Sequence, residues 1–210
     1  MSALPQSSRF AYLATRELQQ LATELQKLKE YVLTSDGKGK YQGHILGFVK
    51  GLRISAKLIY FIRKCLSTAG CSVSWGHIVD ASGQACSPEC DVIIHAPGHL
   101  DKWNEGAAPI MEFVFVEALY VKGVVSCKSH LTSIDEEYPK RLLEFGIQNV
   151  LLFAESCSLS NYENLKAQAV QSGYCGLWCA YFTTGDPDKV IIDEEHHVEF
   201  WTALRELFAA

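Results

Sequence analysis

The sequence predicts an α/β fold, in which a central mixed sheet is flanked by helices and preceded by an N-terminal helical extension. Three observations lead to this prediction. Leucines recur at helical spacing near the start of the chain, β-rich runs fill its middle, and strands alternate with helices in its last third. Such alternation is typical of a partly parallel sheet, because a crossover helix must return the chain before the next parallel strand.

Residues 8–33 have the pattern of an amphipathic helix. Apolar side chains recur every three or four residues, at Leu18, Leu21, Leu25, Leu28 and Val32. This short heptad seam leaves two interpretations open: the helix lies on its own domain, or it pairs with a second copy to make a homodimer. The flexible run SDGKGKYQG follows at 35–43. We therefore expect an N-terminal helical element over 1–36 and an α/β domain over 44–210.

The middle of the chain begins with a second helix, predicted over 44–68. Strands are predicted over 72–80 and 91–96, and a longer extended run over 112–129. The segment PGHLDKWNEGAAP between the last two runs is predicted as a loop.

The last third supplies the alternating elements. Helical patterns cover 138–146 and 161–173, apolar strand runs cover 149–156 and 176–184, and an amphipathic helix is expected over 198–208. The helix over 138–146 ends at a glycine, which is a common C-terminal signal.

Composition describes an ordinary globular protein, with 48% hydrophobic and 20% charged residues among 210. We expect a cytoplasmic chain without a membrane span, because no apolar run reaches about 18 residues and the start lacks the layout of a signal peptide. The net charge of −5 argues against wholesale electrostatic binding of nucleic acid. Lysines and arginines nevertheless concentrate in 38–64, where they either follow a phosphate backbone or solvate one helix face.

Cysteines and tryptophans give weaker signals. The eight cysteines include two C-x3-C pairs, Cys86/Cys90 and Cys175/Cys179, but free buried thiols are the expected state. The four tryptophans, including Trp75 and Trp178, are spread along the chain, so we expect core packing and no platform for stacking bases.

Lys128 is out of place in the β-rich run VVSCKSHLT, because an ammonium among apolar strand residues needs a partner. Asp91 opens the strand DVIIH, and if the two strands are neighbours both side chains reach the same edge of the sheet. A carboxylate can hold Mg²⁺ or Mn²⁺ while a lysine orients water and offsets charge on a phosphate. The pair therefore points to phosphodiester chemistry.

These segments resemble the PD-(D/E)XK nuclease superfamily, and in particular an uncharacterised bacterial domain family within it. The resemblance rests on SPECDVIIH, VEALY and VVSCKSHLT, with LLEFGIQNVLLFAE and GYCGLWCAY towards the end, and it covers roughly 44–205. It implies a restriction-endonuclease-like core, a divalent metal cofactor, a DNA or RNA partner and, by analogy, a role in bacterial genome defence.

Two carboxylates of the family pattern are missing. Ser126 stands where the pattern has a glutamate two residues before the lysine, and Ser55 stands where the preceding helix has another. The resemblance thus assigns Asp91, Lys128 and Ser126 to the catalytic site, with Asp91 as the retained metal ligand. Glu89, Glu112 and Glu117 are the candidates to replace the lost ligand.

Three functions remain open from the sequence. The leading hypothesis is a nuclease-fold protein with a degenerate metal site that binds nucleic acid or regulates another protein. The alternatives are an active Mg²⁺- or Mn²⁺-dependent DNA endonuclease with a relocated carboxylate, and a dimeric protein-interaction scaffold.

Overall fold

The computed structural model describes residues 16–26, 44–66, 70–97, 100–102, 113–186 and 189–209. The strands are β1 (Ser72–Val79), β2 (Cys90–His95), β3 (Leu100–Lys102), β4 (Phe113–Glu117), β5 (Val121–Leu131), β6 (Val150–Ser158), β7 (Gly176–Thr183) and β8 (Val190–Ile191). The helices are α2 (His44–Leu66), α3 (Glu137–Leu143), α4 (Tyr162–Gln171) and α5 (Glu194–Ala209), and residues 16–26 are also helical. Two short 3-10 helices cover Ala118–Tyr120 and Leu159–Asn161.

The strands form one mixed sheet in the order β3-β4-β1-β2-β5-β6-β7-β8. β2 pairs antiparallel with both β1 and β5, whereas β5, β6 and β7 run parallel. The parallel half is the part that alternates with helices in the sequence, and its strands are buried on both faces. The predicted α/β class with a mixed sheet is confirmed.

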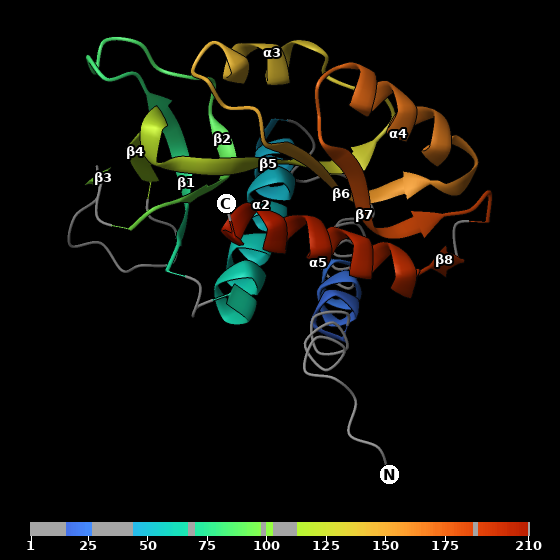
Figure 1. Ribbon diagram of the computed structural model, residues 1–210. Coiled ribbons are helices and arrows are strands. Elements are labelled where there is room, and N and C mark those ends of the chain that lie inside the picture. The colour runs from blue at the N-terminus through green and yellow to red at the C-terminus, as the bar shows by residue number, and fades with distance from the viewer. Residues whose placement is uncertain are drawn as a thin grey trace.

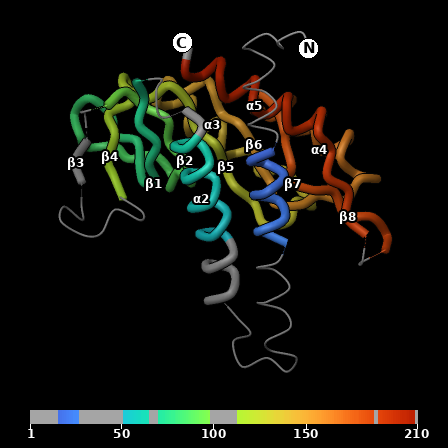
Figure 2. The backbone as a smooth tube through the Cα atoms, turned by 90° about the horizontal axis from the view of Figure 1, so that it is seen from below, coloured from blue at the N-terminus to red at the C-terminus, as the bar shows by residue number. Residues whose placement is uncertain are grey.

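Helices cover both faces of the sheet (Figure 1). α3 and α4 lie on one face, and α2, α5 and the helix over 16–26 lie on the other, where Figure 2 shows them side by side. Each face has its own hydrophobic core. The core beneath α2 and α5 includes Leu58, Phe153 and Phe200. The core beneath α3 and α4 includes Leu142, Leu152 and Leu165.

The N-terminal helix packs on its own chain. Leu18 and Leu25 are fully buried and Leu21 nearly so, in the same core as Ile54 and Trp201. The described part of the helix is therefore an integral layer of the domain, and the predicted boundary between 1–36 and 44–210 does not divide the core. The remainder of 8–33, with Leu28 and Val32, lies outside the described residues.

Two departures from the predicted elements shape the site. The extended run 112–129 is interrupted by the 3-10 turn Ala118–Tyr120, which separates β4 from β5, and the predicted loop before it contains the short strand β3. β4 then pairs parallel with β1. The close pairing depends on Gly76, since a Cβ there would lie 2.0 Å from the carbonyl oxygen of Val114.

The last helix begins at Glu194, four residues before the predicted start. Asp193 explains the earlier start, because its carboxylate accepts hydrogen bonds from the backbone N–H groups of Glu195 and His196. The first turn of α5 therefore includes the EEHH run.

Candidate functional site

Asp91 and Lys128 lie on neighbouring strands, as predicted. Asp91 is the second residue of β2, and β2 pairs with β5, where Lys128 follows Cys127. One carboxylate oxygen of Asp91 accepts a hydrogen bond from the backbone N–H of Cys127 at 2.8 Å. The other lies 3.2 Å from the hydroxyl of Ser55, on α2. Both oxygens are thus held by groups of the protein itself.

Burial raises the pKa of the Asp91 carboxyl above its ordinary value, because a charged carboxylate loses hydration there. The N–H of Cys127, the ammonium of Lys128 and the hydroxyl of Ser55 oppose this rise, and the charge of Glu89 adds to it. Lys128 is half-buried and acts on Asp91 through its charge. The ion pairs of the described chain do not include one between these two residues.

The two serines at the missing carboxylate positions are buried. Ser55 is 2% exposed and Ser126 is 1% exposed. The Ser55 hydroxyl is shared between Asp91 and the carbonyl oxygen of Gly51, each at 3.2 Å. Ser55 therefore closes the position beside Asp91 with a neutral donor, where a carboxylate would add a second negative charge.

The structure places Glu117 away from Lys128. Glu117 ends β4, and β1 and β2 lie between that strand and β5, so three inter-strand spacings of about 4.8 Å divide Glu117 from Lys128. The prediction of Glu117 as a metal ligand is not supported by this placement, because β4 joins β1 and does not continue into β5. Glu112 lies outside the described residues.

Glu89 remains near Asp91 but is engaged elsewhere. β2 begins at Cys90, so the strand does not extend back to Glu89, as a shared face with Asp91 would require. Its carboxylate accepts a hydrogen bond from the indole N–H of Trp75 at 2.7 Å. Glu89 is exposed, and its charge still reaches Asp91.

The residues present do not fit a divalent cation well. Among the described residues, no group of three or more histidine, cysteine, aspartate or glutamate side chains is placed to hold a metal ion. Of the carboxylates that the structure describes, Asp91 alone lies at the predicted position, and both of its oxygens are hydrogen-bonded. Mg²⁺ needs several oxygen ligands in near-octahedral geometry, so a single carboxylate that is already hydrogen-bonded binds it weakly.

The described cysteines, including both members of each C-x3-C pair, are free thiols.

The structure contains a buried charge network around Glu155 that is not among the features predicted from the sequence. Glu155 of β6 is 1% exposed and forms an ion pair with Arg53 of α2. The hydroxyl of Tyr181 donates a second hydrogen bond to Glu155 at 3.1 Å. The glutamate within the apolar run NVLLFAES could have predicted this network, because a charged residue in an apolar strand needs a partner, as Lys128 does.

Four rings form a stripe on β1 and β4, next to β2. Trp75 and His77 alternate with buried residues on β1, and Phe113 and Phe115 do so on β4. Trp75 and Phe113 meet edge to face at 5.0 Å, and His77 stacks on Phe115 at 5.8 Å. All four are half-exposed, and Trp75 also packs against the hydrophobic core, as expected for the tryptophans.

The basic segment is largely neutralised within the chain. Lys57 pairs with Glu24, and Lys64 pairs with Glu17. Arg63 donates to the carbonyl oxygen of Val73 at 2.6 and 3.0 Å. With Arg53 held by Glu155, the cations described in 51–64 stabilise the packing of α2. The side chains of Lys38, Lys40 and Lys50 lie outside the described residues.

The sheet order and the flanking helices define a restriction-endonuclease-like fold. Solved structures of NucC share it. The chain matches E. coli MS115-1 NucC in its cAAA-bound form at 13% identity and TM-score 0.60, covering 100% of this chain and 92% of that one. It matches P. aeruginosa ATCC27853 NucC, also cAAA-bound, at 12% identity and TM-score 0.62, covering 99% and 92%.

The apo form of E. coli MS115-1 NucC matches at 14% identity and TM-score 0.51, covering 90% of this chain and 92% of that chain. No protein-family profile matches the sequence, and no curated protein is significantly similar to it. In the described part of the chain, no helix is long and apolar enough to cross a membrane.

Proposed function

We propose that this protein is a PD-(D/E)XK-like nucleic-acid-binding protein with a reduced metal site, which binds or regulates and does not cut. The observation that carries the proposal is the environment of Asp91, where the neutral groups Ser55 and Cys127 N–H occupy both carboxylate oxygens. The fold shared with the NucC structures is the support for a place in bacterial defence.

The aromatic stripe supports nucleic acid as the partner. Its rings flank the strand that carries Asp91, and the indole of Trp75 is tied to Glu89. Half-exposed rings at alternate positions of neighbouring strands are suited to stacking unpaired bases. Stacking is insensitive to net charge, so it is compatible with a protein of net charge −5.

The test is a metal titration and a plasmid-nicking assay on the unmodified protein. We expect no saturable binding of Mg²⁺ or Mn²⁺ in the micromolar range and no nicking. The same measurements on Ser55→Glu and on Ser55→Glu/Ser126→Glu should show tighter metal binding, because each glutamate adds a charged ligand beside Asp91. Asp91→Asn in the double variant is the matched control and should abolish the gain.

One observation favours the active endonuclease as a second candidate. The charge of Glu89 reaches Asp91, so a rotation away from Trp75 would bring a second carboxylate to the site. Nuclease members of this fold class generally use a divalent metal. Nicking by the unmodified protein, lost in both Asp91→Asn and Glu89→Gln, would establish this candidate in place of the first.

Nucleic-acid binding is measured separately, by gel shift with single-stranded and double-stranded DNA at several salt concentrations. We expect a preference for the single strand, reduced about tenfold or more by Phe115→Leu, since stacking on one ring contributes about 1–3 kcal/mol. Leu119→Ala is the control, because Leu119 is an exposed apolar residue outside the stripe. Equal loss in both variants, or no binding, would contradict a stacking surface.

A further inference from the structure

A carboxylate borders the aromatic stripe on β1 and β4. Glu89 directly precedes β2, and the first residue of β2, Cys90, pairs with Gly76 of β1. This register places Glu89 beside Trp75 and His77, and the hydrogen bond from the Trp75 N–H holds its carboxylate there at 2.7 Å. A negative charge therefore lies next to rings that are suited to stacking bases.

The ring of His77 is held in one tautomer. Its Nδ1 lies 2.9 Å from the carbonyl oxygen of Ser87, which can only accept, so Nδ1 carries the hydrogen in the neutral ring. Nε2 is then an acceptor, and it has no hydrogen bond to another described residue. Because the ring also stacks on Phe115, the direction of this acceptor is fixed.

The side-chain polar atoms that remain at the stripe accept hydrogen bonds. The indole N–H of Trp75 is already donated to Glu89, and Phe113 and Phe115 have no polar atom. Glu89 is exposed, and its second oxygen remains available beside Nε2 of His77. A base that binds at the stripe must therefore present N–H donors.

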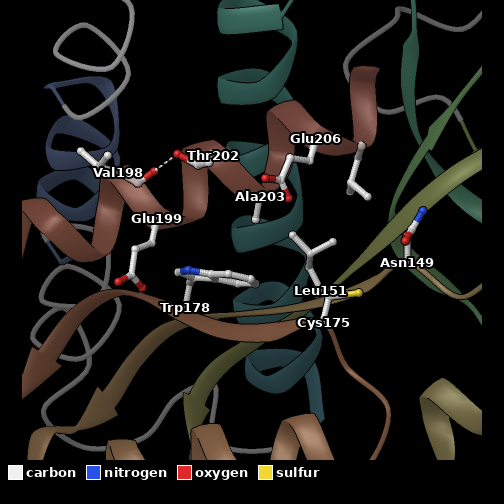
Figure 3. A pocket seen from close by; sticks show the side chains of 10 residues that line it. Asn149, Leu151, Cys175, Trp178, Val198, Glu199, Thr202, Ala203 and Glu206 are labelled. Carbon is white, nitrogen blue, oxygen red and sulfur yellow. Dashed lines mark hydrogen bonds between the residues drawn. The ribbon is translucent and has the colours of Figure 1, made fainter. Parts of the chain in front are cut away.

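Trp178 shows by comparison why the stripe, and not another tryptophan, is suited to this role. Trp178 is 7% exposed, and Figure 3 shows its ring between α5 and the strands. Its N–H is buried and has no acceptor among the described residues. Trp75 is half-exposed, and in Figure 2 its strand β1 and the neighbouring β4 lie beyond α2, on the side away from α5. The stripe thus combines accessible rings with available acceptors.

We infer that the stripe prefers guanine among the bases of single-stranded DNA, an inference that rests on the proposed nucleic-acid function. Guanine presents two adjacent donors, N1–H and N2–H, on its Watson–Crick edge, and a carboxylate can accept both. The other bases place an acceptor beside their donor on that edge, which a carboxylate repels. The base stacks on the phenylalanines, Glu89 accepts from the Watson–Crick edge, and Nε2 of His77 accepts from the same amino group.

The test is fluorescence anisotropy of the full chain with short oligothymidylates that carry one central guanosine or inosine. We expect guanosine to tighten binding at least tenfold over thymidine alone, and inosine, which lacks the amino group, to lose most of that gain. Glu89→Gln should remove the preference, because its amide N–H faces a guanine donor. Glu144→Gln is the matched control, since it removes an exposed charge at the end of α3, on the other face of the sheet, and should keep the preference.

The readout is the ratio of the affinities for the guanosine and thymidine strands, because loss of any acidic side chain favours every polyanion. His77→Phe keeps a ring but removes Nε2, and should lower this ratio about threefold. Circular dichroism establishes that each variant is folded.

A ratio near one in the unmodified protein, with strand binding still lost in Phe115→Leu, would overturn the inference and leave the proposed function standing. A preference for guanosine that persists in Glu89→Gln would overturn it as well. The absence of binding to every strand would overturn both. Free GMP that binds as tightly as the guanosine strand would overturn the assignment to single-stranded DNA.

Discussion

Two carboxylates lie against the same helix, the half-buried Asp91 and the fully buried Glu155, and they are stabilised in different ways. Glu155 has a full counter-charge, because Arg53 pairs with it and Tyr181 donates a hydrogen bond. Among the described residues, the donors in contact with Asp91 are neutral, the Ser55 hydroxyl and the Cys127 N–H, while Lys128 acts through its charge without an ion-pair contact. Burial raises the pKa of Asp91, whereas the network around Glu155 is a closed ion pair.

The difference indicates which carboxylate serves stability and which one is open to a ligand. A buried charge is compensated when a counter-ion is in contact with it. Removing one partner of the pair leaves the other charge buried without compensation, which destabilises the fold. A carboxylate that is held by neutral donors is stabilised further when a cation binds to it or when it is protonated. Asp91 is thus the functional candidate, and Glu155 is a structural anchor between α2 and β6.

The largest expected effect comes from removing the counter-charge of Glu155. Arg53→Met should lower the free energy of unfolding by about 3–5 kcal/mol, because it leaves Glu155 buried and unpaired. Urea denaturation measures the change. The control Arg53→Met/Glu155→Leu replaces the pair with apolar side chains and should recover most of the loss. A cost below about 1 kcal/mol for Arg53→Met would show that Glu155 is not a structural charge.

The second effect concerns the acceptor role of Asp91. Asp91→Ala should cost about 1–3 kcal/mol, since it leaves the buried N–H of Cys127 without an acceptor. Asp91→Asn keeps an oxygen in that place and should cost less. If urea denaturation gives the same loss for both variants, the hydrogen bonds of Asp91 are not what stabilises this corner of the sheet.

The pH dependence of stability should distinguish Asp91 from an ordinary salt-bridged carboxylate. Its folded pKa lies above the ordinary value of 3.8, so the folded protein binds more protons than the unfolded chain between these two values. Its contribution therefore makes the free energy of unfolding fall as pH rises through the window just above 3.8. The difference between the unmodified protein and Asp91→Asn, measured from pH 3 to 7, isolates this slope. A rise with pH would mean that Lys128 pairs with Asp91 in solution.

His196 provides a contrast of opposite sign. Burial lowers its pKa to about 4, so the unfolded chain binds more protons between about 4 and 6.5. Its contribution to stability is present at neutral pH and is lost as pH falls through that window, by up to about 3 kcal/mol. His196→Gln should flatten the acid side of the stability profile. An unchanged profile would show that His196 is accessible to protons when folded.

The smallest effect is a difference between two matched hydroxyl deletions. Tyr181→Phe removes a hydrogen-bond donor to Glu155, the partner of Arg53, and should cost about 1.5–3 kcal/mol, whereas Ser55→Ala removes a donor to Asp91 and should cost about 0.5–1.5 kcal/mol. The expected difference in free energy of unfolding is about 1 kcal/mol. Equal costs would indicate that Asp91 carries as much charge in the folded state as Glu155 does.

Much of this architecture was available from local patterns. The parallel strands β6 and β7 and the helix α4 between them were predicted to within two residues at each end. Buried apolar runs that flank an amphipathic helix are typical of parallel strands joined by a crossover. Asp91 and Lys128 were found because a charge in an apolar strand violates the local rule. The predicted restriction-endonuclease-like fold rested on the same strands, and the observed sheet confirms that fold.

Tertiary pairing decided the rest of the site. The sequence separation between Glu117 and Lys128 does not show that β4 pairs with β1, three strands from β5, because strand order is set by contacts between distant segments. The stripe on β1 and β4 has the same origin, since its rings come from segments almost 40 residues apart. The partner of Arg53, 102 residues away, was equally hidden. The local sequence thus determined which charged residues lie in apolar strands, and the sheet order determined which of these residues are in contact.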